Sequence, residues 1–222
     1  MARVLILALL SASLSACGGL VPGGEPPRQA SVSHSPALLP KQPEARRCLA
    51  DLGQARAAFT PLPDQYYGAG CTTLGTVRLA SLRSDDAVLG LSNLGPVTCP
   101  LAETFAGWAR FGVDRAAQQV LGSPVVRIET MGSYNCRNVA GSTRRSAHAT
   151  ASAIDVSGFV LADGRRITIR GDWQSQSPKV RQFLTVVHAS ACKRFGTVLG
   201  PAYNAAHFDH LHVELSGRAL CR

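Results

Sequence analysis

Apolar residues recur with the period of a helix in two long segments of the chain. The first runs from Pro100, which suits the first turn of a helix, to Gly122, a residue type that often ends one. Its apolar stripe is Leu101, Phe105, Trp108, Val113, Ala116 and Val120. The second follows the cap residue Ser177 and Pro178, with a stripe of Val180, Phe183, Leu184, Val187 and Ala191. We predict two helices whose aromatic residues pack in the core.

Shorter apolar segments predict strands. Residues 125–130, 198–199 and 210–215 are strand candidates, and residues 155–169 are typical of a hairpin around the turn-forming pair Asp163-Gly164. No internal repeat stands out. The pattern predicts an α+β fold with a single domain over residues 46–222, in which a small antiparallel sheet is flanked by helices.

The N-terminus has the pattern of a secretory signal over residues 1–16. Arg3 precedes an apolar run that is too short to span a bilayer, and small residues lead to Cys17. The stretch Leu14-Ser15-Ala16-Cys17 also resembles a bacterial lipobox, which implies cleavage before Cys17 and its acylation. A plain signal peptide cut nearby is the alternative. Gly18 after the cysteine resembles lipoproteins sent to an outer membrane, so we expect an exported lipoprotein that faces the periplasm.

Residues 17–45 are expected to form a disordered tether. Six of the 13 prolines lie here, separated by glycine and serine: Pro22, Pro26, Pro27, Pro36, Pro40 and Pro43. At about 3.1 Å per residue, such a segment reaches on the order of 80 Å from a membrane anchor. The predicted organisation is therefore signal peptide 1–16, acylated cysteine and linker 17–45, and folded domain 46–222.

The remaining cysteines are even in number, as expected for disulfides in an exported chain. They are Cys48, Cys71, Cys99, Cys136, Cys192 and Cys221. We predict three disulfides, and the sequence does not choose among the possible pairings. No CxxC pair occurs, which argues against a cysteine-based zinc or thioredoxin-like site.

The charge is positive but scattered. The chain has 23 basic and 14 acidic residues, a net charge of +9, and aromatic residues make up only 6%. Because no basic block alternates with stacking residues, we expect no specific nucleic-acid partner. Non-specific attraction to anionic wall polymer or lipid headgroups is the weaker inference that the charge permits.

Four of the six histidines gather in two short segments together with carboxylates. His148 precedes Asp155 by seven residues, and His207, His210 and His212 lie close together near the C-terminus. Alternate residues of a strand share a face, so His210 and His212 should point together, and Asp155 should face away from its apolar neighbours. Two imidazoles and one carboxylate satisfy three positions of a zinc ion and leave the fourth for water, which is the catalytic pattern.

These motifs, in this order, resemble a known group. Ser146-Ala147-His148 with Asp155 and a late His-x-His resembles the superfamily of zinc D-alanyl-D-alanine carboxypeptidases, lysostaphin and murein endopeptidases. A wider frame resembles, more narrowly, the bacterial extensin-like C-terminal domain family: Gly132-Ser133-Tyr134-Asn135-Cys136-Arg137, Ser146-Ala147-His148-Ala149 and Ala153-Ile154-Asp155-Val156-Ser157-Gly158-Phe159. The resemblance covers most of residues 46–222.

The resemblance implies roles for individual residues. His148, Asp155 and His212 become ligands of one zinc ion, carried by the sheet. Asp209 matches the acidic general base of the carboxypeptidase branch, where glutamate is commoner, and His210 matches the histidine that assists water activation in the endopeptidase branch. The general base stays open between these two. Arg137 matches an arginine that binds the substrate's carboxylate. A glycine of the relatives is replaced by Ala151 or Ser152, a departure that affects the shape of the cleft.

Each residue also has a simpler interpretation. Asp155 and His148 would suit an exposed turn and loop, Arg137 could merely brace a disulfide-bonded loop, and His188 and His207 are expected to be structural or surface groups. The leading hypothesis is a zinc-dependent peptidase acting on stem peptides or cross-links of peptidoglycan, with the membrane contacted through the lipid anchor.

Two other functions compete with this hypothesis. One is a non-catalytic module with the same fold that binds peptidoglycan. A less favoured one is a periplasmic metal-binding or nucleic-acid-associated protein. The sequence specifies neither the scissile bond, nor zinc over a neighbouring transition metal, nor an oligomeric state.

Overall fold

A computed structural model describes residues 42–215 and 219–222 of the chain. The predicted signal peptide, Cys17 and nearly all of the predicted tether lie outside these residues. The first helix begins at Pro43, three residues before the expected start of the domain at residue 46. Pro43 is one of the prolines that we assigned to the linker, but proline is also favoured in the first turn of a helix. Over the described ranges, no helix is both long and apolar enough to cross a membrane.

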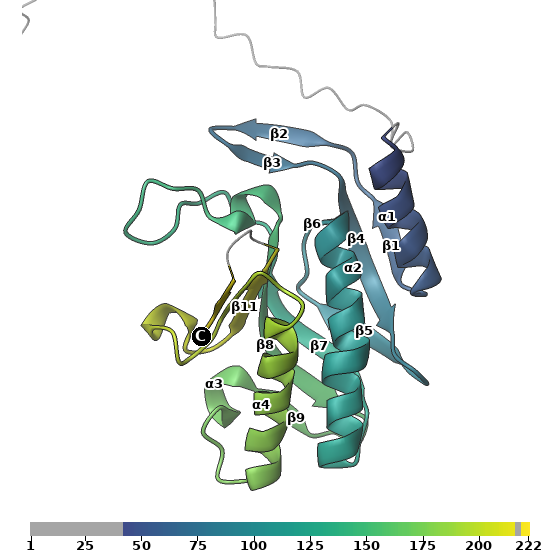
Figure 1. Cartoon of the computed structure of the whole chain (residues 1–222), viewed down its shortest axis with the longest axis vertical. Coiled ribbons are helices and arrows are strands. Elements are labelled where there is room, and N and C mark those ends of the chain that lie inside the picture. Colours follow the sequence, from purple (N-terminus) through teal and green to yellow (C-terminus); the bar gives the residue numbers. More distant parts are fainter. Residues whose placement is uncertain (1–41, 216–218) are drawn as a thin grey trace, which may run out of the picture. The chain divides into compact units, whose positions relative to one another are not determined.

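The described chain folds as an α+β domain (Figure 1). Its α-helices are α1 (Pro43–Gln54), α2 (Cys99–Trp108), α3 (Ile169–Asp172) and α4 (Pro178–Cys192). Shorter helical turns are η1 (Ala109–Asp114), η2 (Ala117–Leu121), η3 (Ala147–Thr150) and η4 (Ala205–His207). The strands are β1 (Ala58–Pro61), β2 (Gln65–Gly68), β3 (Cys71–Thr73), β4 (Thr76–Arg83), β5 (Val88–Ser92), β6 (Val97–Thr98), β7 (Val125–Gly132), β8 (Ala153–Leu161), β9 (Arg166–Thr168), β10 (Thr197–Leu199), β11 (Leu211–Glu214) and β12 (Leu220–Cys221).

The main sheet is larger than the sequence predicted, and it is mixed. Ten strands take part, in the order β1-β4-β5-β7-β8-β11-β10-β12, with β6 beside β4 and β9 beside β8. The pairs β5–β7 and β10–β12 are parallel and the other pairs are antiparallel. The expectation of a small antiparallel sheet was therefore wrong. Parallel β5 and β7 need a crossover connection, which α2 with η1 and η2 supplies.

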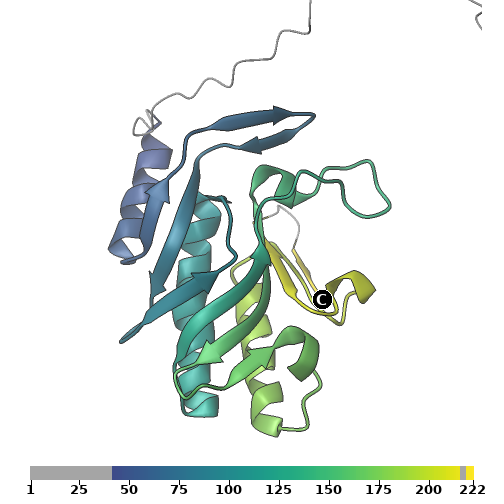
Figure 2. The same ribbon diagram turned by 180° about the vertical axis from the view of Figure 1, so that it is seen from behind.

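Helices cover one face of this sheet. Figure 1 shows α2 and α4 in front of the strands, and Figure 2, turned by 180°, shows the strands in front of these helices. Ile128 of β7, Ile154 of β8 and Val213 of β11 are fully buried in the core between the layers. On each of these strands, the residues next to the buried one point to the other face of the sheet, as strand alternation requires. That face carries Asp155.

The two predicted long helices are confirmed. Helix α2 begins at Cys99 with Pro100 in its first turn, and the chain continues helically through η1 and η2 to Gly122, which has a left-handed φ of 71°. In α4, the Ser177 side chain accepts a hydrogen bond from the backbone N–H of Val180, so the expected cap is present. The predicted strands and the hairpin at Asp163-Gly164 are also present.

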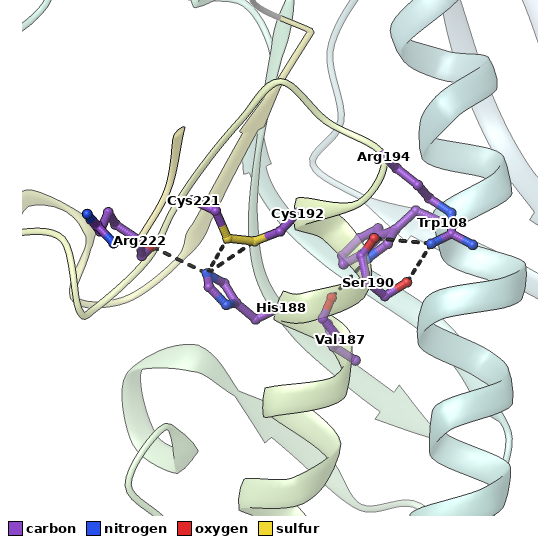
Figure 3. The surroundings of a disulfide bond; sticks show 8 residues. All are labelled: Trp108, Val187, His188, Ser190, Cys192, Arg194, Cys221 and Arg222. Atoms are coloured by element: carbon purple, nitrogen blue, oxygen red, sulfur yellow. Dashed lines mark hydrogen bonds between the residues drawn. A yellow bond between two sulfur atoms is a disulfide. The ribbon is translucent and has the colours of Figure 1, made fainter. Parts of the chain in front are cut away.

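Three disulfides form, as predicted, and the structure supplies their pairing. They are Cys48–Cys99, Cys71–Cys136 and Cys192–Cys221. The third joins the end of α4 to β12 and closes a loop that contains β10, η4 and β11 (Figure 3). His188 lies beside it, with Nε2 about 4.0 Å from both sulfur atoms and 3.3 Å from the carbonyl oxygen of Arg222. The structural interpretation of His188 fits this position.

A close approach of α4 to the α2–η1 segment depends on glycine. A Cβ built on Gly112 would lie 2.9 Å from Ser190 Cβ and 2.9 Å from Trp108 Cδ1, which is closer than side-chain atoms pack. The Trp108 indole also donates a hydrogen bond to the carbonyl oxygen of Val187, 3.2 Å away. At Gly112, therefore, the two helical segments leave no room for an added methyl group.

Replacing Gly112 with alanine should lower the free energy of unfolding by about 1–3 kcal/mol through overpacking. Gly107→Ala is the matched control in the same helical segment, because nothing lies within 4 Å of its added Cβ. That control should raise stability by about 0.5–1 kcal/mol, since alanine favours helix more than glycine does. Urea unfolding of both variants measures the difference, and equal effects would contradict the contact.

Candidate metal centre

The three predicted ligand residues come together from three elements. Asp155 lies on β8 directly opposite His212 of β11 in the antiparallel register. His148 lies in η3, a short turn that begins after Ser146, whose side chain accepts the backbone N–H of His148. The turn ends at Ala151, which has a left-handed φ of 53°, and the chain then enters β8. The sharp reversal brings His148 back over Asp155.

The candidate ligand atoms lie slightly closer together than the ligands of a tetrahedral ion. His148 Nε2 lies 3.2 Å from Asp155 Oδ1 and 3.1 Å from His212 Nδ1, and His212 Nδ1 lies 2.9 Å from Asp155 Oδ1. Zinc bonds of about 2.0–2.1 Å in a tetrahedron separate their ligand atoms by about 3.3 Å. The three side chains are also well buried, with exposed fractions of 3% for His148, 14% for Asp155 and 9% for His212.

The second ring nitrogen of each histidine faces a hydrogen-bond acceptor. His148 Nδ1 lies 3.1 Å from the carbonyl oxygen of Ser133, and His212 Nε2 lies 3.1 Å from Glu214 Oε2. These nitrogens therefore carry hydrogen, which leaves the other ring nitrogens of neutral imidazoles with lone pairs directed at each other and at Asp155. Only a proton or a metal cation between them satisfies such an arrangement, so the donor set fits a metal.

Sequence reasoning missed Ser133 and Glu214 as supports of the site. Glu214 follows His212 by two residues on β11, so strand alternation places both on one face. That spacing was a usable signal. The contribution of Ser133 is a backbone carbonyl, and no side-chain pattern indicates it. Partners of this kind fix the tautomer and orientation of metal-binding histidines.

Buried charges shift the pKa values of these groups. Burial alone would raise the pKa of Asp155, but hydrogen bonds with His148 and His212 outweigh it and hold that pKa well below its usual range. Burial would lower the pKa of His212, yet its hydrogen bonds with Asp155 and Glu214 raise the pKa to about 9. Without a metal, therefore, His212 holds a proton at neutral pH.

The Asp209–His210 pair lies beside this cluster. His210 Nδ1 lies 2.9 Å from Asp209 Oδ1, while His210 Nε2 lies 3.6 Å from Asp155 Oδ1. His210 and His212 thus approach Asp155 from the same side, as alternation along the strand predicted. Among the residues that the structure describes, Asp209 has no direct bond with the three ligand residues. Its carboxylate reaches the cluster only through His210.

Other residues singled out in the sequence lie around the cluster. Arg137 is exposed, beside the Cys71–Cys136 disulfide. Its guanidinium donates to the carbonyl oxygen of Asn138, and its charge lies close enough to His207 to help lower the pKa of that imidazole. The His207 ring lies 5.1 Å from that of His210 and 5.9 Å from that of His212. Burial, followed by the charges of His210 and His212, lowers the pKa of His207 to about 4.

A second group of possible ligand atoms is not available for a metal. His188, Cys192 and Cys221 offer nitrogen and sulfur atoms within 4.8 Å of one another. Figure 3 shows that the two sulfurs are joined in a disulfide. A metal binds the thiolate form of cysteine, which these residues lack while the bond is intact.

The fold and site define an α+β domain with a His₂Asp cluster on the open face of a mixed sheet. Residues 46–222 match the family model described as "Extensin-like protein C-terminus", and the chain belongs to this family. Searches of curated proteins and of solved structures found no match. The resemblance to the narrower family is thus confirmed, and the wider metallopeptidase superfamily is left as a proposal.

In a chelating buffer, the domain should lose stability as the pH rises from 6.5 to 9. Folding favours protonated His212, so this contribution is complete below the unfolded pKa of about 6.5 and is lost as the pH passes about 9. The lowered pKa values of His207 and His188 affect the stability of the fold only at lower pH. Urea unfolding should show a loss on the order of 1–3 kcal/mol. An equal loss in His212→Gln would contradict the assignment.

Proposed function

We propose that this domain is a zinc-dependent peptidase that cleaves stem peptides or cross-links of peptidoglycan. The observation that carries the proposal is the convergence of His148, Asp155 and His212, whose separations of 2.9–3.2 Å are close to the ligand spacing of about 3.3 Å around tetrahedral zinc. The order of these residues supports a place in the superfamily of D-alanyl-D-alanine carboxypeptidases, lysostaphin and murein endopeptidases. Asp155 and Glu214 carry the charge that a divalent cation would balance.

The three ligands would hold zinc through His148 Nε2, Asp155 Oδ1 and His212 Nδ1. When bound, zinc supplies Lewis-acid activation of water and of a peptide carbonyl. Ser133 and Glu214 would keep both imidazoles in the tautomer that presents a lone pair. The ligand set leaves one position open, as in catalytic rather than structural sites.

His210 and Asp209 would have different roles in proton transfer. A carboxylate that accepts the Nδ1–H of a histidine leaves its Nε2 free to take a proton, and His210 Nε2 faces the cluster. We therefore assign the general base to His210 and a positioning role to Asp209. The imidazole can then give the proton to the leaving amine. This proposal chooses between the two residues that the sequence left open.

The proposed location is the bacterial envelope. It rests on the signal-like residues 1–16, the lipobox-like Cys17 and the Pro-rich stretch before the domain. The three disulfides of the domain fit an oxidising compartment outside the cytoplasm. An outer-membrane lipoprotein facing the periplasm would hold the domain within reach of peptidoglycan.

A non-catalytic peptidoglycan-binding module is the second candidate. The observation that favours it is the position of Asp209, whose carboxylate bonds to His210 and touches none of the three ligand residues within the described chain. The direct carboxylate base expected by analogy with the carboxypeptidase branch is therefore missing. Release of soluble fragments from isolated sacculi, compared with binding to them, separates the two candidates.

Metal analysis of the purified domain should find about one zinc per chain, lost in His212→Ala. Glu214→Gln should weaken zinc binding by about 10–100-fold, because Glu214 orients His212. The exposed Glu103→Gln is the matched control and should have no effect. Because His212 must lose a proton, affinity should rise by about tenfold per pH unit up to about pH 9. No zinc in folded wild-type protein would contradict the site.

In digests of isolated muropeptides, His210→Ala should lower kcat by about 10²–10⁴-fold with zinc retained. Asp209→Asn should lower kcat while leaving KM and zinc content unchanged, since Asp209 acts through His210. The exposed Asp86→Asn serves as control. If folded, zinc-loaded protein cuts no muropeptide and Asp209→Ala changes nothing, the peptidase proposal fails in favour of the binding module.

A further inference from the structure

His188, Cys192 and Cys221 form a group of metal-ligating atoms that the proposed function does not use. His188 and Cys192 are four residues apart on α4, and residues at this spacing lie on one face of a helix. Cys221 comes from β12. Figure 3 shows the imidazole of His188 directed at the two sulfur atoms, with Nε2 about 4.0 Å from each of them. The three ligand atoms therefore converge from a helix and a strand.

Backbone hydrogen bonds hold β12 in place next to β10. Cys221 lies opposite Val198 of β10 in the parallel pair. The N–H of Leu220 donates to the carbonyl oxygen of Gly196 at 2.9 Å, and the N–H of Arg222 donates to that of Val198 at 3.0 Å. Because these bonds do not involve the sulfur atoms, we expect Cys221 to stay beside α4 when the S–S bond is broken.

The imidazole of His188 is held in a form that can bind a metal. The Trp173 ring packs edge-on against it, with the ring centres 5.7 Å apart. Burial lowers the pKa of His188, so the imidazole is neutral at neutral pH, as a metal ligand must be. Its Nε2 lies 3.3 Å from the carbonyl oxygen of Arg222, which is longer than a usual N–H···O bond, so this contact competes only weakly.

The spacing is close to that of a metal bound by one imidazole and two thiolates. Zinc bonds of about 2.0–2.1 Å to nitrogen and about 2.3 Å to sulfur place these ligand atoms about 3.5–3.6 Å apart in a tetrahedron. The separations of 4.0 Å between His188 Nε2 and the two sulfurs must shorten by about 0.4–0.5 Å. Two sulfur ligands of one zinc ion lie about 3.8 Å apart, so the S–S bond must be broken first.

We infer that the dithiol form of Cys192 and Cys221 binds a thiophilic metal ion together with His188, and that the ion and the disulfide exclude each other. Thiolate ligands select zinc or copper(I), whereas magnesium and calcium prefer oxygen ligands. Cys221 is exposed, so water can complete the coordination. The inference does not rest on the proposed peptidase function and uses none of its residues.

The two forms interconvert with a dithiol as co-reactant. The dithiol attacks the Cys192–Cys221 bond, loses two electrons and two protons, and closes into its own disulfide, while the two cysteines become thiols. A divalent ion then displaces the two thiol protons. In reverse, a disulfide oxidant takes two electrons from the thiolates, which join to each other and release the ion. A newly made chain passes through the dithiol form before its disulfides close.

The metal ion would connect the same two elements as the disulfide. Either crosslink joins the end of α4 to β12 and closes the loop that contains β10, η4 and β11. A metal in the dithiol form would therefore hold this part of the fold together before the cysteines are oxidised.

Cobalt(II) binding to protein reduced with dithiothreitol, which is then removed without air, tests the inference. Sulfur ligands give cobalt an intense near-ultraviolet charge-transfer band, which the sulfur-free cluster of His148, Asp155 and His212 cannot give. Reduced protein should show this band, and excess zinc should remove it. Oxidised protein should lack it. Cys221→Ser should abolish the band, and His188→Ala should weaken cobalt binding on the order of 100-fold, because one of three protein ligands is lost.

Two variants control for other histidines and other thiols. His207→Ala removes a half-buried histidine outside the group and should keep the band. The double variant Cys71→Ser, Cys136→Ser removes a different disulfide and should also keep it. A band that disappears in the double variant would place the cobalt at that pair and overturn the inference.

The variant Cys221→His keeps the test decisive if the reduced protein does not fold. It cannot form the third disulfide, leaves the other two intact, and offers an imidazole in place of the thiol. It should bind cobalt with a band from Cys192 and lose it when His188→Ala is added. The inference is overturned if folded, reduced wild-type protein shows no band, if His188→Ala leaves the affinity unchanged, or, where reduced protein is unfolded, if Cys221→His binds no cobalt through sulfur.

Discussion

The register between β8 and β11 is the constraint on which the candidate site depends. Asp155 lies opposite His212, and the apolar pairs Leu211–Val156 and Ile154–Val213 flank them. All four of these apolar residues are completely buried. A shift of one residue would turn them toward the open face and bury Asp155 in the core, so hydrophobic burial fixes the register. The polar cluster is thus positioned by the apolar residues on the opposite face of the same two strands.

The cluster itself is held by a balance of buried charges. Asp155 and Glu214 are carboxylates on the two sides of His212, and their hydrogen bonds with it offset the cost of burying all three groups. His148 closes the third side and is anchored by the Ser133 carbonyl. Removing one member leaves a buried charge or lone pair without a partner, which makes the arrangement an all-or-none unit.

The rest of the fold supplies the surroundings of this unit. The Cys192–Cys221 disulfide ties both ends of the segment that contains His210, His212 and Glu214, and this restricts the unfolded chain in the region that supplies half of the cluster. The change of partner along β8 at Ser157 then opens a cavity beside Asp209. The same strand thereby carries one candidate metal ligand, Asp155, and one lining residue of that cavity, Ser157.

The sequence by itself determined the α+β class and both long helices with their caps, because these depend on local periodicity and capping. The candidate ligand residues His148, Asp155 and His212 were proposed from the resemblance of their motifs to a known superfamily, and the structure brings them together. The sequence did not determine the pairing of the six cysteines, the size and mixed character of the sheet, or the helical start at Pro43. Strand alternation could have indicated Glu214, whereas no side-chain pattern indicates the Ser133 carbonyl. Only the tertiary structure decided these, because contacts between residues far apart in the chain depend on strand register and on how the layers pack, which local pattern does not encode.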